Sequence, residues 1–184
     1  ADQNTIQIER HWDGLRVEIV SHDVKRMFEM LLEHNAYVLE QIFSPLPLLE
    51  TPDMAELRSL LRTHFVREHG RHYVGFAQKQ WKMARKLYPH CAKPLLTMAR
   101  NLLTGVHLMR TGEMELRLPL LADLYQVPEL QDLIALRQQE GEAANLSAWN
   151  LEGDFKRLFA HWNERLEKAY ADSHLPDHTE LLPP

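Results

Sequence analysis

The residues best placed for chemistry lie in residues 93–112, KPLLTMARNLLTGVHLMRTG. In a helix, at about 100° per residue, one face of this stretch collects a row of polar side chains that contains no carboxylate. The row consists of Lys93, Thr97, Arg100, Thr104, His107 and Thr111. Threonine is a poorer helix former than the Glu or Lys of an ordinary free surface, so its repeated use indicates a contact partner. Cations, hydroxyls and an imidazole in one row favour a polar, anionic ligand; a solvated helix face is the alternative.

The ends of this stretch indicate the helix that must position the row. Pro94 stands near its start and Gly112 just past its end, as is usual for helices. Leucine, methionine, alanine and valine fill the opposite side. Gly105 within the helix costs about 1 kcal/mol relative to alanine, which predicts a close helix contact at this position.

Charge is unevenly distributed along the 184 residues, although the net charge is only −5. Residues 58–100 hold ten basic residues and one acidic residue, Glu68, a local charge of +9. Residues 1–57 and 101–184 each carry −7. A basic central third suits a phosphate-bearing ligand. Alternatively, the basic helices pair with the acidic thirds.

Length and composition predict one globular domain of a reducing compartment, which we expect to be the cytoplasm. The single cysteine, Cys91, excludes an internal disulfide. No apolar run is long enough to span a membrane, and residues 1–30 lack the apolar h-region typical of a signal peptide. The eleven histidines lack the spacing of a zinc site, and no glycine-rich phosphate loop is present. The chain starts at Ala1 without a methionine, which suggests a processed or trimmed start.

The periodicity predicts a mainly α fold, bundle-like, with about seven helices and one short N-terminal strand. Residues 15–20 alternate as a strand should, and this strand needs a partner that the rest of the chain does not obviously offer. Ser21 is expected to cap the first helix, and Gly70 to break the chain before a helix at 71–88. We expect the helices at 21–34, 36–43, 52–65, 71–88, 93–111, 118–125, 128–139 and 151–170, with a disordered tail at 173–184.

Three further residue sets could carry function. Glu18 lies in the middle of the predicted strand, either as a metal carboxylate or as a solvent-facing side chain. Gln80 falls on the apolar side of its helix, so it is either a hydrogen-bonded core amide or a ligand contact. Arg100 and His107 resemble the paired residues of the all-helical HEPN ribonucleases, in which the arginine binds phosphate and the histidine assists 2′-hydroxyl attack.

Three ordered blocks resemble the C-terminal portion of bacterial predicted nucleotidyltransferases of the DNA polymerase β superfamily, in the branch linked to RNA repair. The blocks are VEIVSHDVKRMFEMLLEHNAYVLEQIFSP, HYVGFAQKQW and KPLLTMARNLLTGVHLMRTGE. The resemblance covers residues 17–115, with weaker agreement to residue 139. Members carry a catalytic α/β domain with a Gly-Ser motif and an Asp-x-Asp pair, then a strand with a third carboxylate, then a helical domain.

The resemblance implies roles for particular residues. Glu18 would be the catalytic third carboxylate that holds Mg²⁺. Lys93 and Arg100 would bind triphosphate oxygens, with Lys79 as a weaker candidate. Tyr73 would stack on or hydrogen-bond the base. The remaining nucleotide contacts would come from Gln80 and His107.

This sequence departs from the family pattern because it contains no Gly-Ser motif and no Asp-x-Asp pair on a strand. We therefore expect residues 1–20 to be the last strand of a catalytic domain and residues 21–172 to be the helical domain that binds nucleotide and substrate. The chain is then a fragment, a degenerate member, or the partner of a separate catalytic half, and inactive alone. Its partners would be an NTP and an RNA, protein or small-molecule acceptor, or a second copy. A non-catalytic helical interaction module is the other alternative. The preferred NTP, the acceptor and the oligomeric state stay open.

Overall fold

The computed structural model describes residues 4–141 and 144–177. A β-hairpin comes first and eight α-helices follow in these described residues, which confirms the mainly α fold. The strands are β1 (Thr5–Trp12) and β2 (Leu15–His22). The helices are α1 (Val24–Leu32), α2 (Ala36–Ile42), α3 (Pro52–Arg62), α4 (Glu68–Leu87), α5 (Lys93–Thr111), α6 (Leu118–Leu124), α7 (Pro128–Glu140) and α8 (Lys156–Ala171), which follows the π-helical turn η2 (Leu151–Phe155).

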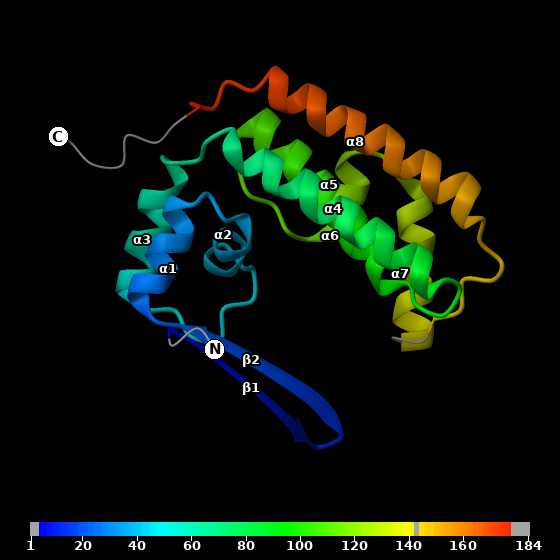
Figure 1. Cartoon of the computed structure of the whole chain (residues 1–184), viewed down its shortest axis with the longest axis horizontal. Coiled ribbons are helices and arrows are strands. Elements are labelled where there is room, and N and C mark those ends of the chain that lie inside the picture. The colour runs from blue at the N-terminus through cyan, green and yellow to red at the C-terminus, as the bar shows by residue number, and fades with distance from the viewer. Residues whose placement is uncertain (1–3, 142–143, 178–184) are drawn as a thin grey trace.

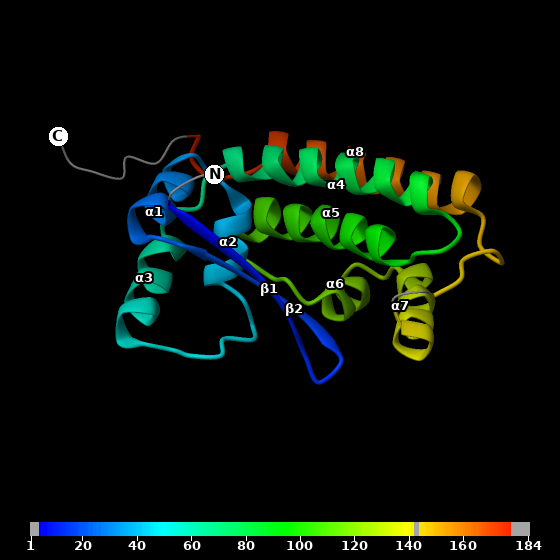
Figure 2. The same ribbon diagram turned by 60° about the horizontal axis from the view of Figure 1, so that its bottom comes forward.

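Helix α5 is the centre of the core. Helices α4 and α8 lie along it on one side, while α6 and α7 cover it from another (Figures 1 and 2). At Gly105 an added Cβ would lie 2.9 Å from Tyr73 Cβ and 2.9 Å from Leu166 Cδ1. The predicted close contact at this glycine is therefore confirmed: it lets α4 and α8 approach α5 together. Gly112, with φ 73°, ends the helix in the left-handed conformation that glycine tolerates best.

The predicted strand has its partner in β1, which the polar N-terminal sequence does not reveal. Asp13 and Gly14, both with positive φ, form the two-residue turn that joins the strands. Of the two faces of the hairpin, one is mainly apolar and exposed, with 74% of Trp12, 69% of Leu15 and 61% of Ile6 open to solvent. The hairpin projects away from the helices (Figure 1).

Two predicted boundaries differ in the structure. Asp23, not Ser21, caps α1, because its carboxylate accepts the Arg26 backbone N–H at 2.7 Å while Ser21 belongs to β2. Helix α4 begins at Glu68, so Gly70 lies within its first turn instead of breaking the chain. An added Cβ on Gly70 would lie 2.9 Å from Met109 Sδ, which shows that this glycine also serves close packing.

The first part of the predicted disordered tail is attached to the bundle. The Ser173 hydroxyl donates to the Met109 carbonyl at 2.8 Å, and the Arg67 backbone N–H donates to the Pro176 carbonyl at 2.9 Å. Residues 178–184 of the predicted tail lie outside the described residues. Within the described part of the chain, no helix combines the length and the hydrophobicity needed to cross a membrane.

Candidate functional site

The polar row on α5 faces other elements of the fold over much of its length. Thr104 is fully buried, and its hydroxyl donates to the Glu115 carbonyl at 2.9 Å. The hydroxyls of Thr97 and Thr111 donate to the carbonyl four residues earlier in the helix, at 2.9 and 2.7 Å. These bonds satisfy the threonines inside the helix. The solvated-face interpretation therefore does not hold for the middle of the row.

Arg100 sits at the junction of α2, α4 and α5, paired with a carboxylate. Its Nη1 lies 2.8 Å from Glu40 Oε2, and the two side chains are 28% and 17% exposed. Its Nη2 also donates to Asn101 Oδ1 at 3.3 Å. A guanidinium held in this way is oriented, yet its partial exposure leaves it within reach of a ligand.

The same junction holds a buried amide with an unused donor. Asn101 is 2% exposed, and its Nδ2 has no hydrogen-bond partner. Such a donor is expensive to bury, at about 1–3 kcal/mol, unless a ligand or water accepts from it. The donor lies on the side chain that accepts from Arg100, so both groups can serve one anionic oxygen.

Tyr73 of α4 lies at the same junction, near Glu40 and Arg100. Its ring is 1% exposed, and its hydroxyl donates to Met114 Sδ at 3.4 Å. Burial, with the nearby Glu40 carboxylate, raises the pKa of the Tyr73 hydroxyl well above its ordinary value, so the group stays protonated. A ring without an exposed face cannot stack on a base, which corrects that predicted role of Tyr73.

His107 forms a hydrogen bond with Tyr125, which lies at the end of α6. Its Nδ1 lies 3.2 Å from the Tyr125 hydroxyl, and the ring is half-buried. Burial lowers the pKa of His107, although Glu113 and Glu115 act in the opposite direction, so the imidazole is neutral near pH 7. Arg100 pairs with Glu40 on α2, whereas His107 contacts Tyr125 at the end of α6, so the two residues of the proposed ribonuclease pair have different partners.

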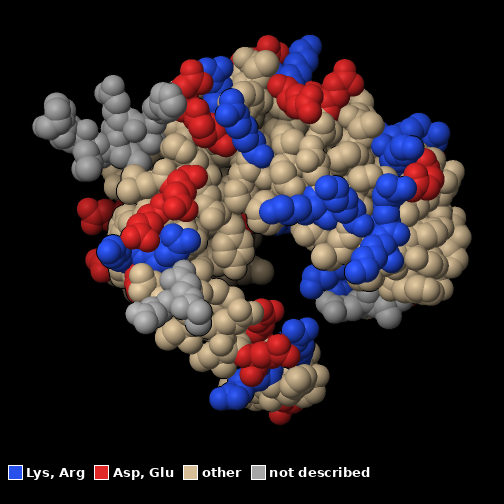
Figure 3. All heavy atoms as spheres, viewed as in Figure 1, with Lys and Arg blue, Asp and Glu red and all other residues tan. Residues whose placement is uncertain are grey.

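The other predicted nucleotide contacts lie at the edges of this region. Lys93 is exposed in the first turn of α5, and Gln80 is half-buried on α4. Lys79 is exposed, with its Nζ 5.5 Å from the centre of the Phe76 ring. Figure 3 shows Lys and Arg side chains gathered over α4, beside a hollow between the helices and the hairpin. This surface carries the positive charge that the sequence predicts for the central third.

Glu18 lies on the exposed hairpin, directly opposite Glu9 in the strand register. The Gln7 amide donates to the Glu18 carboxylate, and Arg16 holds Glu9 through two contacts of 2.8 and 3.0 Å, which lower the pKa of Glu9. Within residues 4–141 and 144–177, no three His, Cys, Asp or Glu side chains gather as a metal site requires. These residues therefore do not fit Mg²⁺ at Glu18 by themselves.

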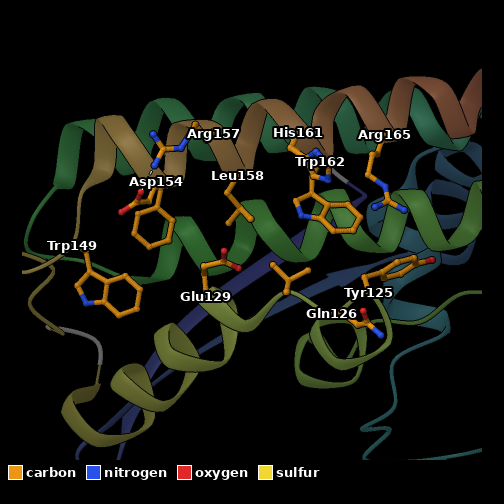
Figure 4. Close-up of a pocket in the computed structure, with 12 residues that line it drawn as sticks. Tyr125, Gln126, Glu129, Trp149, Asp154, Arg157, Leu158, His161, Trp162 and Arg165 are labelled. Carbon is orange, nitrogen blue, oxygen red and sulfur yellow. Dashed lines mark hydrogen bonds and ion pairs between the residues drawn. The ribbon is translucent and has the colours of Figure 1, made fainter.

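A groove that the sequence did not reveal runs beside α8 (Figure 4). It has a volume of about 610 Å³ and lies between α8, the turn η2 and the start of α7. Tyr125, Trp149, His161 and Arg165 line it, with Trp162 beneath. The available signal was the four-residue spacing of Arg157, His161 and Arg165, which places all three on one face of α8.

One family model matches the chain: RlaP, described as the RNA repair pathway DNA polymerase beta family, over residues 3–181. The match extends well beyond residues 17–139 and includes β1 and α8. Comparisons with curated proteins and with solved structures found no match.

Proposed function

The chain belongs to the RNA repair pathway DNA polymerase beta family, and on this premise we propose that its helices bind the nucleoside triphosphate of a nucleotidyltransferase. The reaction would transfer a nucleoside monophosphate to a hydroxyl of an RNA, protein or small-molecule acceptor. The observation that carries the proposal is the half-exposed Arg100 beside the unused donor of buried Asn101.

A phosphate group fits these two donors. Guanidinium groups bind phosphate through charge-assisted hydrogen bonds, each worth about 1.5–3 kcal/mol. In the structure, the Glu40 carboxylate forms an ion pair with the guanidinium. We propose that a phosphate oxygen takes the place of the Glu40 carboxylate and also accepts from Asn101 Nδ2. Glu40 then keeps Arg100 oriented when no nucleotide is bound.

Lys93 supports a second phosphate in this arrangement. It precedes Arg100 by seven residues, which places it about 10 Å away along the helix axis on nearly the same face. A long lysine side chain can cover much of that distance toward a neighbouring phosphate. The exposed Lys79 adds to the positive potential that attracts the triphosphate.

The chain's own role in this proposal is binding and orientation. A bound Mg²⁺ would supply charge neutralisation of the phosphates during transfer. The described residues do not form a site for it at Glu18. We expect the 184-residue chain, incubated with labelled NTPs, Mg²⁺ or Mn²⁺ and mixed acceptors, to transfer no label. Robust transfer would show that the needed carboxylates lie within these residues.

Equilibrium titration with ATP and GTP tests the binding site. Arg100→Gln should weaken binding by about tenfold or more, since one charge-assisted contact is lost. Glu40→Gln should instead tighten binding, because the phosphate no longer competes with a carboxylate. The double variant Glu40→Gln/Arg100→Gln, which leaves no unpaired charge, should bind as weakly as Arg100→Gln.

Lys82→Ala is the matched control, because Lys82 is an exposed cation of α4 that points away from the packed side of that helix. It should change the dissociation constant little. Equal, small effects of Arg100→Gln and Lys82→Ala at low salt would overturn the proposed site. So would weaker binding by Glu40→Gln, which would make the Arg100–Glu40 pair a structural contact only.

A further inference from the structure

The groove beside α8 continues into a second hollow of about 550 Å³ between the C-terminal halves of α5 and α8. Arg165 lines both hollows, so they adjoin at its side chain. Together they follow α8, which is 16 residues and therefore about 24 Å long. At about 3.4 Å per stacked nucleotide, this length accommodates several nucleotides.

Cations without an acidic partner converge where the two hollows meet. Arg110 from α5 and Arg165 and Lys168 from α8 all line the second hollow. Within the described residues, none of the three has a carboxylate at ion-pair distance. Asp172 is the acidic residue on that wall. Most other arginines of the bundle are neutralised, as Arg85 is by Glu152 at 2.8 Å. The first hollow holds two carboxylates, Glu129 and Asp154, beside Arg157 and Arg165, so the excess of cations within the groove lies at its Arg165 end.

Aromatic rings form the other part of the groove. Trp149 and Tyr125 are half-buried, so each keeps ring surface open to the groove. Trp149 stacks on buried Phe155 with ring centres 5.5 Å apart, and Tyr125 packs edge-on against buried Trp162 at 5.5 Å. Figure 4 shows Trp149 at one end of the groove, with Tyr125 and Arg165 at the other. The buried rings hold the open rings rigidly in place.

Arg165 is itself oriented by an aromatic ring. Its guanidinium carbon lies 4.6 Å from the centre of the Trp162 ring, a cation–π arrangement. Among the described residues, the guanidinium has no carboxylate at ion-pair distance, and it lines both hollows. By contrast, Arg157 at the far end is paired with Asp154 through a 2.5 Å contact.

We infer that the α8 groove binds a single-stranded oligonucleotide, with bases against Trp149 and Tyr125 and phosphates on Arg110, Arg165 and Lys168. Open aromatic faces combined with a cationic track are what single strands require, because every base can stack and every linkage is anionic. A duplex presents stacked, paired bases and cannot offer base faces to the rings. This site is separate from the Arg100 junction and does not depend on nucleotide binding there.

Fluorescence anisotropy with labelled eight-nucleotide single-stranded RNA and DNA, at low salt, tests the inference. Arg165→Ala should weaken binding by about tenfold. The slope of log affinity against log salt should become shallower by about 0.7, since one phosphate contact is lost. Trp149→Leu should weaken binding while Trp149→Phe largely preserves it, because stacking needs a ring. Comparison of the two strands shows whether the groove prefers the ribose.

Arg62→Ala provides a matched control, since Arg62 is also an exposed arginine over an aromatic ring, 5.4 Å from Phe43, on α3. Equal effects of Arg165→Ala and Arg62→Ala would overturn the inference. The inference would also be overturned if duplex or inorganic polyphosphate bound with equal affinity and Trp149→Leu had no effect. Binding would then depend on charge and not on base stacking. Arg165→Ala should leave ATP affinity unchanged, and Arg100→Gln should leave oligonucleotide affinity unchanged. The two proposals can thus fail independently.

Discussion

Helices α5 and α8 each carry a row of arginine and histidine side chains, and the two rows have different partners. On α5, Arg100 is paired with Glu40 and His107 is bonded to Tyr125. On α8, Arg165 lies over Trp162 without a carboxylate partner among the described residues, and His161 is exposed. Other helices surround α5, whereas α8 lies at the surface (Figure 2). A similar sequence pattern thus has carboxylate and hydroxyl partners within the fold in α5, whereas in α8 the arginine lies over an aromatic ring.

The largest expected effect is on the pH dependence of the free energy of unfolding. It compares the buried His69 of α4 with the exposed His161 of the groove. Burial lowers the pKa of His69 to about 4 from its ordinary 6.5. The unfolded chain therefore binds the proton first as pH falls, and stability is lost from about pH 6.5 downward, by about 3 kcal/mol at pH 4. Urea unfolding across this range should show the slope in the wild type and in His161→Gln. His69→Gln should flatten it; an unchanged slope in that variant would contradict the assignment.

The next largest effect tests how tightly α5 is enclosed. Gly105→Ala should destabilise the fold by about 1–3 kcal/mol, because the added methyl meets Tyr73 and Leu166 at 2.9 Å. Gly75→Ala, on the open side of α4 with no atom within 4 Å, should instead stabilise by up to about 1 kcal/mol. Thermal unfolding followed by circular dichroism measures both. Similar shifts in the same direction would contradict the close contact at α5.

A smaller effect on stability is expected when Arg100 and Arg165 are each replaced by alanine. Arg100→Ala leaves the largely buried Glu40 unpaired and should cost about 1–2 kcal/mol of stability. Arg165→Ala breaks no ion pair and should change stability by less than about 0.5 kcal/mol. A double-mutant cycle with Glu40→Gln isolates the pair energy. A cost for Arg165→Ala as large as for Arg100→Ala would remove the distinction between the two rows.

The smallest effect is expected for RNA cleavage, the activity that the ribonuclease alternative predicts. Because Arg100 and His107 contact different neighbours, we expect no RNA cleavage in EDTA by the purified chain, and therefore no change with His107→Ala. Denaturing gels at high protein concentration measure this. Cleavage without metal that His107→Ala abolishes would favour the HEPN-type function over nucleotide binding.

Most helices could be predicted because their signals are local. Asn35 caps α2, Thr51 and Pro52 begin α3 and Gly112 ends α5, each within a few residues of chain, and these helices start at residues 36 and 52 and end at residue 111 as their predicted ranges do. Gly70 was misinterpreted because its role depends on Met109, 39 positions later in the chain. Strand β1 was missed because Arg10 interrupts the alternation of Ile6, Ile8 and Trp12, on a hairpin whose two faces both meet solvent.

The site could be predicted only in part, for the same reason. The row on α5 follows from helix periodicity, but the Glu40 that pairs with Arg100 lies on another helix, 60 positions away in the chain. The burial of Tyr73 likewise depends on tertiary packing. The α8 groove combines residues of the α6–α7 connection, α7, η2 and α8, and its aromatic residues have the spacing of an ordinary core. Residue spacing within one helix cannot show whether a side chain packs inside the core or lines a groove.

The distribution of indole rings makes the molecule a spectroscopic reporter of its own groove. Trp12 is 74% exposed at the hairpin tip, whereas Trp162 is 4% exposed beneath Arg165 and Trp149 lies at the opposite end of the groove. The hairpin indole should emit at long wavelength and be reached first by a neutral quencher such as acrylamide. Trp12→Phe would leave the emission of Trp81, Trp149 and Trp162, of which the last two line the groove.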